Sequence, residues 1–298
     1  MTAVAGPGAT SESVTITVAD PEFGPMVFDA LVAGPVDGPA VILLHGFPET
    51  SASWRHQIPA LAAAGYRVVA PDQRGYSPGA RPTEVDGYRT DRLVADVVGV
   101  ADALGIERFH LVGHDWGGAV AWQVAGRHAE RLVTLSVLST PHPAAFGAAL
   151  AGEGGSDQAS RSGYMEFFRT DGAEHTMLAD DAALLRLVYG GSGLSDTESA
   201  PYLAALSSPP ALGAALNWYR GADITLVDGL SPIVTPTLYV WSTDDVALGR
   251  AAAEATAAFV EGPYRFVELD GVDHWVAEHA PDEVNGVLLS HLAQDVPQ

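Results

Sequence analysis

Short apolar runs rich in β-branched residues alternate along this chain with longer stretches rich in Ala and Leu. This alternation limits the fold more than any other feature, because the runs predict strands and the longer stretches predict helices. The predicted strands cover residues 13–20, 26–32, 41–45, 66–71, 109–114, 132–139, 237–242 and 264–269. The predicted helices cover residues 54–64, 89–104, 117–128, 248–259 and 281–292. After an opening hairpin, the alternation predicts an α/β fold with a mostly parallel sheet and helices on both faces.

The alternation stops in the middle of the chain. Residues 141–232 contain helical segments and loops but no run that predicts a strand. Two stretches rich in Gly and Ser, 151–163 and 190–199, are typical of flexible connections. We therefore expect a first part of the α/β core in residues 1–140, a helical cap in 141–232, and the second part of the core in 233–298.

Composition excludes several classes of function. The chain has no Cys, which excludes disulfides, thiolate metal sites and a Cys nucleophile. Its formal net charge of -22 opposes binding to nucleic acid or to an anionic membrane surface. The first residues lack the charged and apolar regions of a signal peptide, and no apolar stretch approaches the roughly 18 residues of a membrane helix. The sequence predicts a cytoplasmic protein.

Residues 113–118 read Gly-His-Asp-Trp-Gly-Gly, at the junction between a predicted strand and a predicted helix. A G-x-nucleophile-x-G pattern forms a sharp turn that lifts its central side chain above the sheet. The central residue is Asp115, a carboxylate that is ionised at neutral pH without help from a base. The competing interpretation is that Asp115 only caps the helix that follows.

An Asp at this position favours a particular chemistry. Its attack on an ester would give a labile anhydride, whereas its attack on an electrophilic sp³ carbon gives an alkyl ester that water can hydrolyse. Epoxides and haloalkanes offer such carbons. The backbone N–H groups of Phe47, in the His-Gly-Phe-Pro-Glu loop 45–49, and of Trp116 are candidates for the oxyanion hole. We expect His45 to brace this loop and Pro48 to follow a cis peptide bond.

A nucleophile on such a turn takes its partners in the chain order nucleophile, acid, histidine. Asp244 and Asp245 follow the predicted strand 237–242, and His274 follows the strand 264–269. Loops at the carboxyl ends of parallel strands carry the active sites of open α/β sheets. We expect His274 to activate water and Asp245 to orient it, with Asp244 as the alternative acid.

These motifs resemble the epoxide hydrolase family of the α/β-hydrolase fold over roughly residues 20–293. The resemblance rests on the loop 45–49, on Asp-Gln-Arg-Gly-Tyr-Ser at 72–77, on the turn 113–118, on Ser-Thr-Asp-Asp at 242–245 and on Gly-Val-Asp-His-Trp at 271–275. Ser242 departs from the Gly that is usual in the family's acid loop. The resemblance implies that Asp115 is a covalent nucleophile and supports Asp245 as the acid.

The resemblance also implies two tyrosines in the cap that hydrogen-bond the epoxide oxygen. Tyr219, in Asn-Trp-Tyr-Arg at 217–220, looks like the second of them, and Tyr164 looks like the first. A phenol can donate a proton to the alkoxide that forms when an epoxide opens. Trp116, Trp218 and Phe47 are the expected substrate contacts.

Two alternatives stay open. A haloalkane dehalogenase would use the same Asp nucleophile but would bind halide through N–H donors, for which Trp116 and Trp218 are candidates. A ligand-binding protein of the same fold would be expected to have lost a member of the Asp–Asp–His set or a cap donor. The expected partners are a small epoxide and water, with no metal, cofactor, nucleic acid or membrane, and a homodimer is compatible with the sequence.

Overall fold

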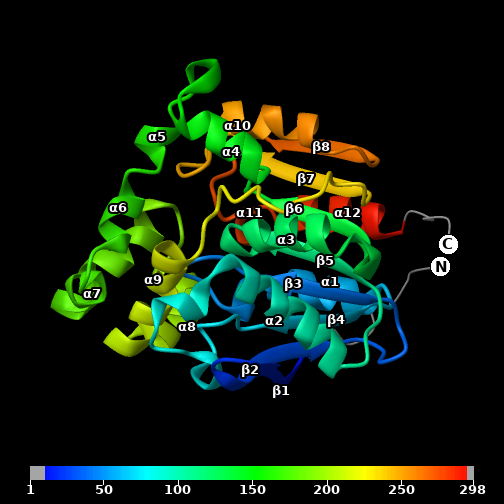
Figure 1. Ribbon diagram of the computed structural model, residues 1–298, viewed down its shortest axis with the longest axis horizontal. Helices are drawn as coiled ribbons and strands as arrows, with labels where there is room; N and C mark the ends of the chain where they lie inside the picture. The colour runs from blue at the N-terminus through cyan, green and yellow to red at the C-terminus, as the bar shows by residue number, and fades with distance from the viewer. Residues whose placement is uncertain (1–10, 294–298) are drawn as a thin grey trace, which may run out of the picture.

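The protein is described by a computed structural model that covers residues 11–293 of the chain. Within that range eight strands form one sheet in the order β1-β2-β4-β3-β5-β6-β7-β8 (Figure 1). The strands are β1 (Glu12–Asp20), β2 (Gly24–Ala33), β3 (Ala40–Leu44), β4 (Arg67–Pro71), β5 (Phe109–His114), β6 (Leu132–Leu138), β7 (Thr237–Ser242) and β8 (Tyr264–Leu269). The first two form an antiparallel hairpin, β2 is antiparallel to β4, and the pairs from β4 to β8 are parallel. The predicted mostly parallel sheet is confirmed.

Helices cover both faces of the sheet. They are η1 (Ser51–Trp54), α1 (Gln57–Ala63), η2 (Pro78–Ala80), η3 (Val85–Tyr88), α2 (Thr90–Ala103), α3 (Trp116–Arg127), η4 (Ala129–Arg131), α10 (Arg250–Ala255), η6 (Thr256–Phe259), α11 (Val276–His279) and α12 (Pro281–Leu292). Among the described residues, no helix combines the length and the apolar character needed to cross a bilayer.

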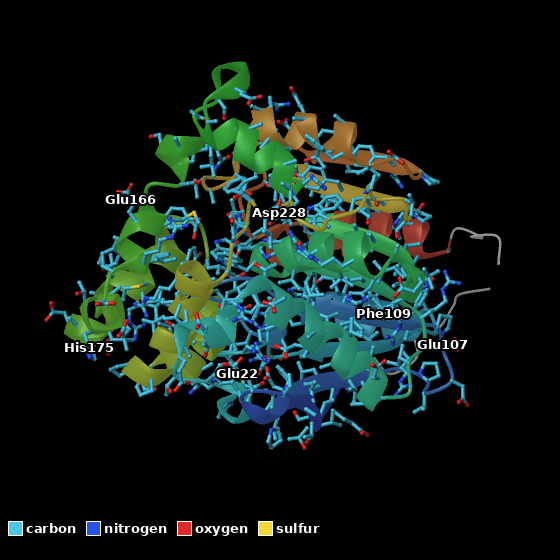
Figure 2. All side chains as sticks on the ribbon, viewed as in Figure 1. Glu22, Glu107, Phe109, Glu166, His175 and Asp228 are labelled. Atoms are coloured by element: carbon cyan, nitrogen blue, oxygen red, sulfur yellow. The ribbon has the colours of Figure 1, made fainter. Side chains whose placement is uncertain are left out.

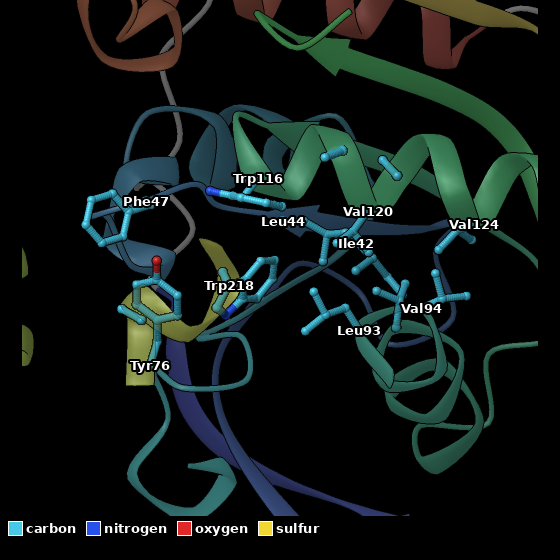
Figure 3. Packing of buried hydrophobic residues seen from close by; sticks show 14 of the residues in the cluster. Ile42, Leu44, Phe47, Tyr76, Leu93, Val94, Trp116, Val120, Val124 and Trp218 are labelled. Carbon is cyan, nitrogen blue, oxygen red and sulfur yellow. The ribbon is translucent and has the colours of Figure 1, made fainter. Parts of the chain in front are cut away.

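Alternate residues of the strands feed two separate cores, because successive side chains in a strand point to opposite faces. Ile42 and Leu44 of β3 pack with α2 and α3, as Figure 3 shows. Val41 and Leu43 of the same strand pack with α1 and α12 on the other face. The five residues of β3 are all buried, which explains why this strand reads as a continuous apolar run.

A helical insertion, defined here as residues 139–236, separates β6 from β7. Its helices are α4 (Pro143–Leu150), η5 (Glu153–Gly155), α5 (Gln158–Arg161), α6 (Tyr164–Arg169), α7 (Ala173–Gly191), α8 (Asp196–Leu206) and α9 (Pro209–Gly221). Apart from one bridge between Ile233 and Val260, the insertion contributes nothing to the sheet. The division of the chain into core and cap domains stays a prediction.

The insertion lies at one end of the sheet, on the left of Figure 1. Phe109, the first residue of β5, lies toward the opposite side of the molecule in Figure 2. The strand β5 therefore runs toward the insertion, and its parallel neighbours do the same. The loops that follow β3, β5, β7 and β8 all meet the insertion at the carboxyl edge of the sheet.

The two Gly/Ser-rich stretches differ from the expectation of flexible connections. The stretch 151–163 contains η5 and α5, and the stretch 190–199 contains the start of α8. Ser195 and Glu198 form a capping box that fixes the first turn of α8, a signal that was present in the sequence as Ser-x-x-Glu. Gln158 of α5 is fully buried against the core, a tertiary contact that local composition does not encode.

Candidate active site

The sharp turn between β5 and α3 places Asp115 at the carboxyl edge of the sheet. Asp115 has φ 50° and ψ −122°, a conformation that costs a non-glycine residue about 1–3 kcal/mol. A Cβ on Gly113 would lie 2.3 Å from the carbonyl oxygen of Gly117, and a Cβ on Gly117 would lie 2.2 Å from that of Leu44. Both positions therefore require glycine. The Asp115 side chain makes no capping hydrogen bond to α3, which contradicts the helix-cap interpretation.

The Asp115 carboxylate lies between two elements of the core. Its Oδ1 accepts a hydrogen bond from the backbone N–H of Phe47 at 2.8 Å. Its Oδ2 lies 3.6 Å from Nε2 of His274. The peptide bond between Phe47 and Pro48 is cis, as predicted. Trp116 is the first residue of α3, so its N–H belongs to the first turn, where backbone donors have no partner within the helix.

His274 connects Asp115 to a second buried carboxylate. Its Nδ1 donates to Oδ2 of Asp245 at 2.9 Å, and Oδ1 of Asp245 accepts the N–H groups of Ala247 and Leu248. Asp245 is only 1% exposed. Asp244, the alternative acid, is exposed, and its backbone N–H bonds to Val272. The geometry supports Asp245 as the partner of His274.

The three groups form a line of alternating charge. Burial opposes the charge on His274, but the charge of Asp245, its hydrogen bond to Nδ1 and the nearby charge of Asp115 raise the His274 pKa well above its ordinary value. Burial also opposes ionisation of Asp115, yet the nearby charge of His274 and the hydrogen bond from the Phe47 N–H keep the Asp115 pKa below its ordinary value. Burial opposes ionisation of Asp245 as well, and the charge of His274 again holds the pKa low. The arrangement suits an imidazolium between two carboxylates.

Two tyrosines of the helical insertion share a cavity of about 200 Å³ with Asp115 and His274. Tyr164 comes from α6 and Tyr219 from α9, and their ring centroids are 6.4 Å apart. Tyr219 is 4% exposed, whereas Tyr164 is 39% exposed. Desolvation and the nearby charge of Asp115 raise the pKa of both phenols, so both stay protonated at neutral pH and can donate. The remaining lining is mostly apolar and comprises Phe47, Phe168, Val188, Ser192, Val246, Ala247 and Trp275.

The two tryptophans that were expected to contact substrate lie behind this lining. The indole N–H of Trp218 donates to the carbonyl oxygen of Arg74 at 2.8 Å, and the residue is 1% exposed. Trp116 packs edge-on against Tyr219, with the ring centroids 5.1 Å apart. It also packs edge-on against Trp218, with the ring centroids 5.8 Å apart (Figure 3). The expectation for Trp218 is therefore corrected: it supports the wall of aromatic rings from behind. Of the three expected substrate contacts, Phe47 lines the cavity directly.

Other histidines lie outside the set formed by Asp115, His274 and Asp245. The ring of His45 donates from Nδ1 to the Gly46 carbonyl and accepts from the Gln73 N–H at Nε2, so it braces its loop as expected. His175 lies at the outer edge of the insertion (Figure 2). Within residues 11–293, no group of three or more His, Asp or Glu side chains is arranged to hold a metal ion.

Sequence reasoning missed a buried pair beside the site. Nδ1 of His114 lies 3.0 Å from Oε2 of Glu49, and Nε2 of His114 lies 2.9 Å from the backbone oxygen of His274. Both residues belong to motifs already singled out, the turn 113–118 and the loop 45–49. The pair links these two loops to the loop that carries His274.

Comparison with known proteins extends these observations. The profile of the alpha/beta hydrolase fold family matches residues 39–281. Epoxide hydrolase A of Mycobacterium tuberculosis is 36% identical over an alignment that covers 87% of this chain and 92% of that protein. Epoxide hydrolase 4 of Mus musculus is 33% identical over 90% of this chain and 77% of its own length. The crystal structure of epoxide hydrolase A from Mycobacterium thermoresistibile superposes with a TM-score of 0.81 at 32% identity, covering 95% of this chain and 98% of that one.

The contact between Asp245 and His274 generates a prediction about protonation. The Asp245→Asn variant should lower the pKa of His274, because the charge of Asp245 is the largest contribution that raises it. The imidazolium of His274 would then lose its proton at a lower pH than in the wild type. An NMR pH titration of the His274 ring, assigned with a His274→Gln variant, measures this shift. The Asp244→Asn variant is the matched control, and a larger shift in that variant would move the role to Asp244.

Proposed function

This chain belongs to the epoxide hydrolase family of the α/β-hydrolase fold, and we propose that it converts an epoxide to a vicinal diol through a covalent ester on Asp115. The observation that carries the proposal is that one cavity brings together the Asp115 carboxylate, the His274 imidazole and the hydroxyl-bearing Tyr164 and Tyr219. An ionised nucleophile, a base and two phenol donors are what opening an epoxide and hydrolysing the resulting ester require.

In the first step, Oδ2 of Asp115 attacks an epoxide carbon. The new C–O ester bond forms as the epoxide C–O bond breaks, and the electron pair passes to the epoxide oxygen. Tyr164 and Tyr219 hydrogen-bond to that oxygen, and one of them supplies the proton. The resulting tyrosinate is reprotonated at the expense of the His274 imidazolium, which leaves His274 neutral for the second step. Oδ1 of Asp115, which accepts the Phe47 N–H, becomes the ester carbonyl oxygen and is already in the oxyanion position.

In the second step, water attacks the carbonyl carbon of the ester. His274 accepts a proton from that water at Nε2, while Asp245 holds the ring through Nδ1. The N–H groups of Phe47 and Trp116 stabilise the negative charge on the tetrahedral intermediate. Cleavage of the ester C–O bond expels the second oxygen of the product as an alkoxide, which takes the remaining proton of the attacking water from the new Asp115 carboxyl group. The diol leaves, and the Asp115 carboxylate and the His274 imidazolium of the free protein are restored.

The charges around His274 prepare it for this second step. In the free protein both Asp115 and Asp245 raise the pKa of His274 and favour the imidazolium. Formation of the ester removes the charge of Asp115, so the pKa of His274 falls at the stage when a neutral base is needed. Asp245 keeps its charge and stabilises the imidazolium that returns when His274 takes the proton of water.

Haloalkane dehalogenation fits the site less well. A halide site needs N–H donors, and the indole of Trp218 is directed to the carbonyl oxygen of Arg74. Trp116 lies behind the lining, and Trp275, which lines the cavity, donates its indole N–H to Oγ of Ser192 at 2.9 Å. The phenols of Tyr164 and Tyr219 suit oxygen instead. The non-catalytic alternative also loses support, because Asp115, Asp245, His274 and both tyrosines are in place.

The lining also indicates the class of epoxide. Among the described residues no Arg lines the cavity, and the chain has no Lys. A carboxylate on the substrate would meet the negative charge of Asp115, and His274, which also lines the cavity, is already paired with Asp115 and Asp245. The volume of about 200 Å³ is below the roughly 300–1,000 Å³ that is typical for drug-sized ligands. We therefore expect a small, neutral and largely apolar epoxide.

A substrate panel tests the proposed function. Purified protein should release diol from neutral epoxides such as styrene oxide, with little turnover of an epoxy carboxylate and no halide release from 1-bromobutane. Diol is measured by chromatography and halide by ion chromatography. Halide release that exceeds diol release would replace the proposal with the dehalogenase alternative, and release of neither product would contradict hydrolysis of both substrate classes.

The cap tyrosines have their own test. Replacing Tyr219 or Tyr164 with Phe should slow ester formation, because the developing alkoxide loses a donor. The loss should approach the roughly hundredfold to thousandfold seen on removal of one oxyanion donor. Rapid-quench kinetics with mass detection of the alkylated protein measures this step. Tyr66→Phe is the control, since Tyr66 packs against His110 away from the cavity. Unchanged ester formation in both single variants and in the double variant would remove the tyrosines from the mechanism.

A further inference from the structure

The loop that carries the acid is held by the helical insertion as well as by the core. The acid loop, which is residues 243–249 between β7 and α10, includes Asp245. Val246 and Ala247 of the same loop line the cavity. Helix α5 of the insertion, which is Gln158–Arg161, packs directly on this loop. A Cβ on Gly249 would lie 3.2–3.4 Å from atoms of Asp157, Gln158 and Arg161, so the approach is close.

Gln158 supplies two hydrogen bonds to the backbone of this loop. Its Nε2 donates to the carbonyl oxygen of Ala247 at 2.7 Å, and its Oε1 accepts the N–H of Gly249 at 2.8 Å. The second N–H of the amide donates to Oγ of Ser162 at 3.0 Å. Gln158 has no measurable exposure. Loss of a buried partner leaves backbone groups unsatisfied, so the loop would have to move to regain hydrogen bonds.

Arg161 supplies a third hydrogen bond, to the acid residue itself. Its Nη1 donates to the backbone oxygen of Asp245 at 2.7 Å, and its Nε pairs with Asp157 one turn earlier on the same helix. The side chain of Asp245 is meanwhile fixed by the N–H groups of Ala247 and Leu248. The insertion therefore bonds to the backbone at Asp245, Ala247 and Gly249, while Asp245 bonds to His274.

We propose that Gln158 and Arg161 are positioning residues that fix the Asp245 loop, so that the helical insertion sets the orientation of the acid toward His274. This proposal rests on the proposed function. Ester formation uses an Asp115 that is already ionised. Ester hydrolysis uses His274 as a base and needs the Asp245 carboxylate within hydrogen-bond distance of Nδ1. A displaced loop should therefore slow the second half-reaction selectively.

The chain offers a closely matched control for Gln158. Gln123 of α3 is 2% exposed, and its Nε2 donates to the backbone oxygen of Leu226 in the insertion at 2.7 Å. Its Oε1 accepts from Arg127. Gln123 therefore bridges the core and the insertion through a buried amide, as Gln158 does, but it has no contact with the acid loop. A general effect of removing such a bridge appears equally in both variants.

The experiment compares the two half-reactions in Gln158→Ala, Arg161→Ala, Arg161→Lys and Gln123→Ala with the wild type, using styrene oxide in single turnovers. In Gln158→Ala and Arg161→Ala, ester hydrolysis should slow by about tenfold to a hundredfold, as expected for a misplaced catalytic group, with ester formation within about twofold. The alkylated protein should accumulate and be visible by intact mass.

Arg161→Lys should recover most of the lost rate of ester hydrolysis, because an ammonium can still donate to the Asp245 carbonyl. Gln123→Ala should not accumulate the adduct.

Arg161 keeps the test decisive if Gln158→Ala does not fold, because its side chain is about one-third exposed and its removal leaves the core intact. Equal slowing of both half-reactions, or an adduct that also accumulates in Gln123→Ala, would overturn the positioning role. Failure of Arg161→Lys to recover ester hydrolysis would do the same. Wild-type protein that forms neither adduct nor diol would instead overturn the proposed function, and the catalytic role of these residues with it.

Discussion

The backbone at Asp115 is held in a conformation with positive φ that few residues other than glycine adopt. Two close contacts hold it there. A Cβ on Gly46 would lie 2.4 Å from Cβ of Asp115, so the loop after β3 passes directly against the turn. The hydroxyl of Thr140 donates to the backbone oxygen of Asp115 at 2.6 Å. The strain is offset by α3, which is buried along nearly its whole length between β3 and α2. This turn fixes where the carboxylate stands and which loops can reach it.

The loops that reach the carboxylate are in turn anchored by the helical insertion. The hydroxyl of Tyr189 donates to the carbonyl oxygen of Pro48, in the loop that supplies the Phe47 N–H. The indole of Trp218 donates to the carbonyl oxygen of Arg74, whose guanidinium is buried against Asp96 and Asp20. In the proposal made here, Gln158 and Arg161 hold the acid loop in the same way. Each anchor includes a side-chain donor from the insertion on a backbone acceptor of the core, and Gln158 also accepts the backbone N–H of Gly249. These bonds hold the loops in place without adding charge to the cavity.

The sequence predicts much of this architecture because the relevant signals are local. The bounds of β5, β7, β8 and α12 match their predicted ranges, since each is a continuous apolar or amphipathic run closed by a turn. The order of Asp115, Asp245 and His274 along the chain also predicts their meeting, because parallel strands bring their carboxyl ends to one edge. Burial and the hydrogen bond to His274 favour Asp245 over Asp244 as the acid, and two adjacent identical residues cannot reveal this difference in sequence.

What the sequence could not predict depends on distant partners. Trp218 was expected in the cavity, but the backbone oxygen that its indole reaches lies in a loop 144 residues earlier. Gln158 lies in a stretch whose Gly and Ser content is typical of flexible loops, and its burial arises from a loop 89–91 residues later. The most direct measurement of the central claim is a single turnover of an epoxide in ¹⁸O-labelled water. Nucleophilic attack by Asp115 places the label in the Asp115 carboxylate and none in the diol, and His274→Gln traps the alkylated peptide. Label in the diol, none in the protein and no trapped adduct would contradict the covalent mechanism.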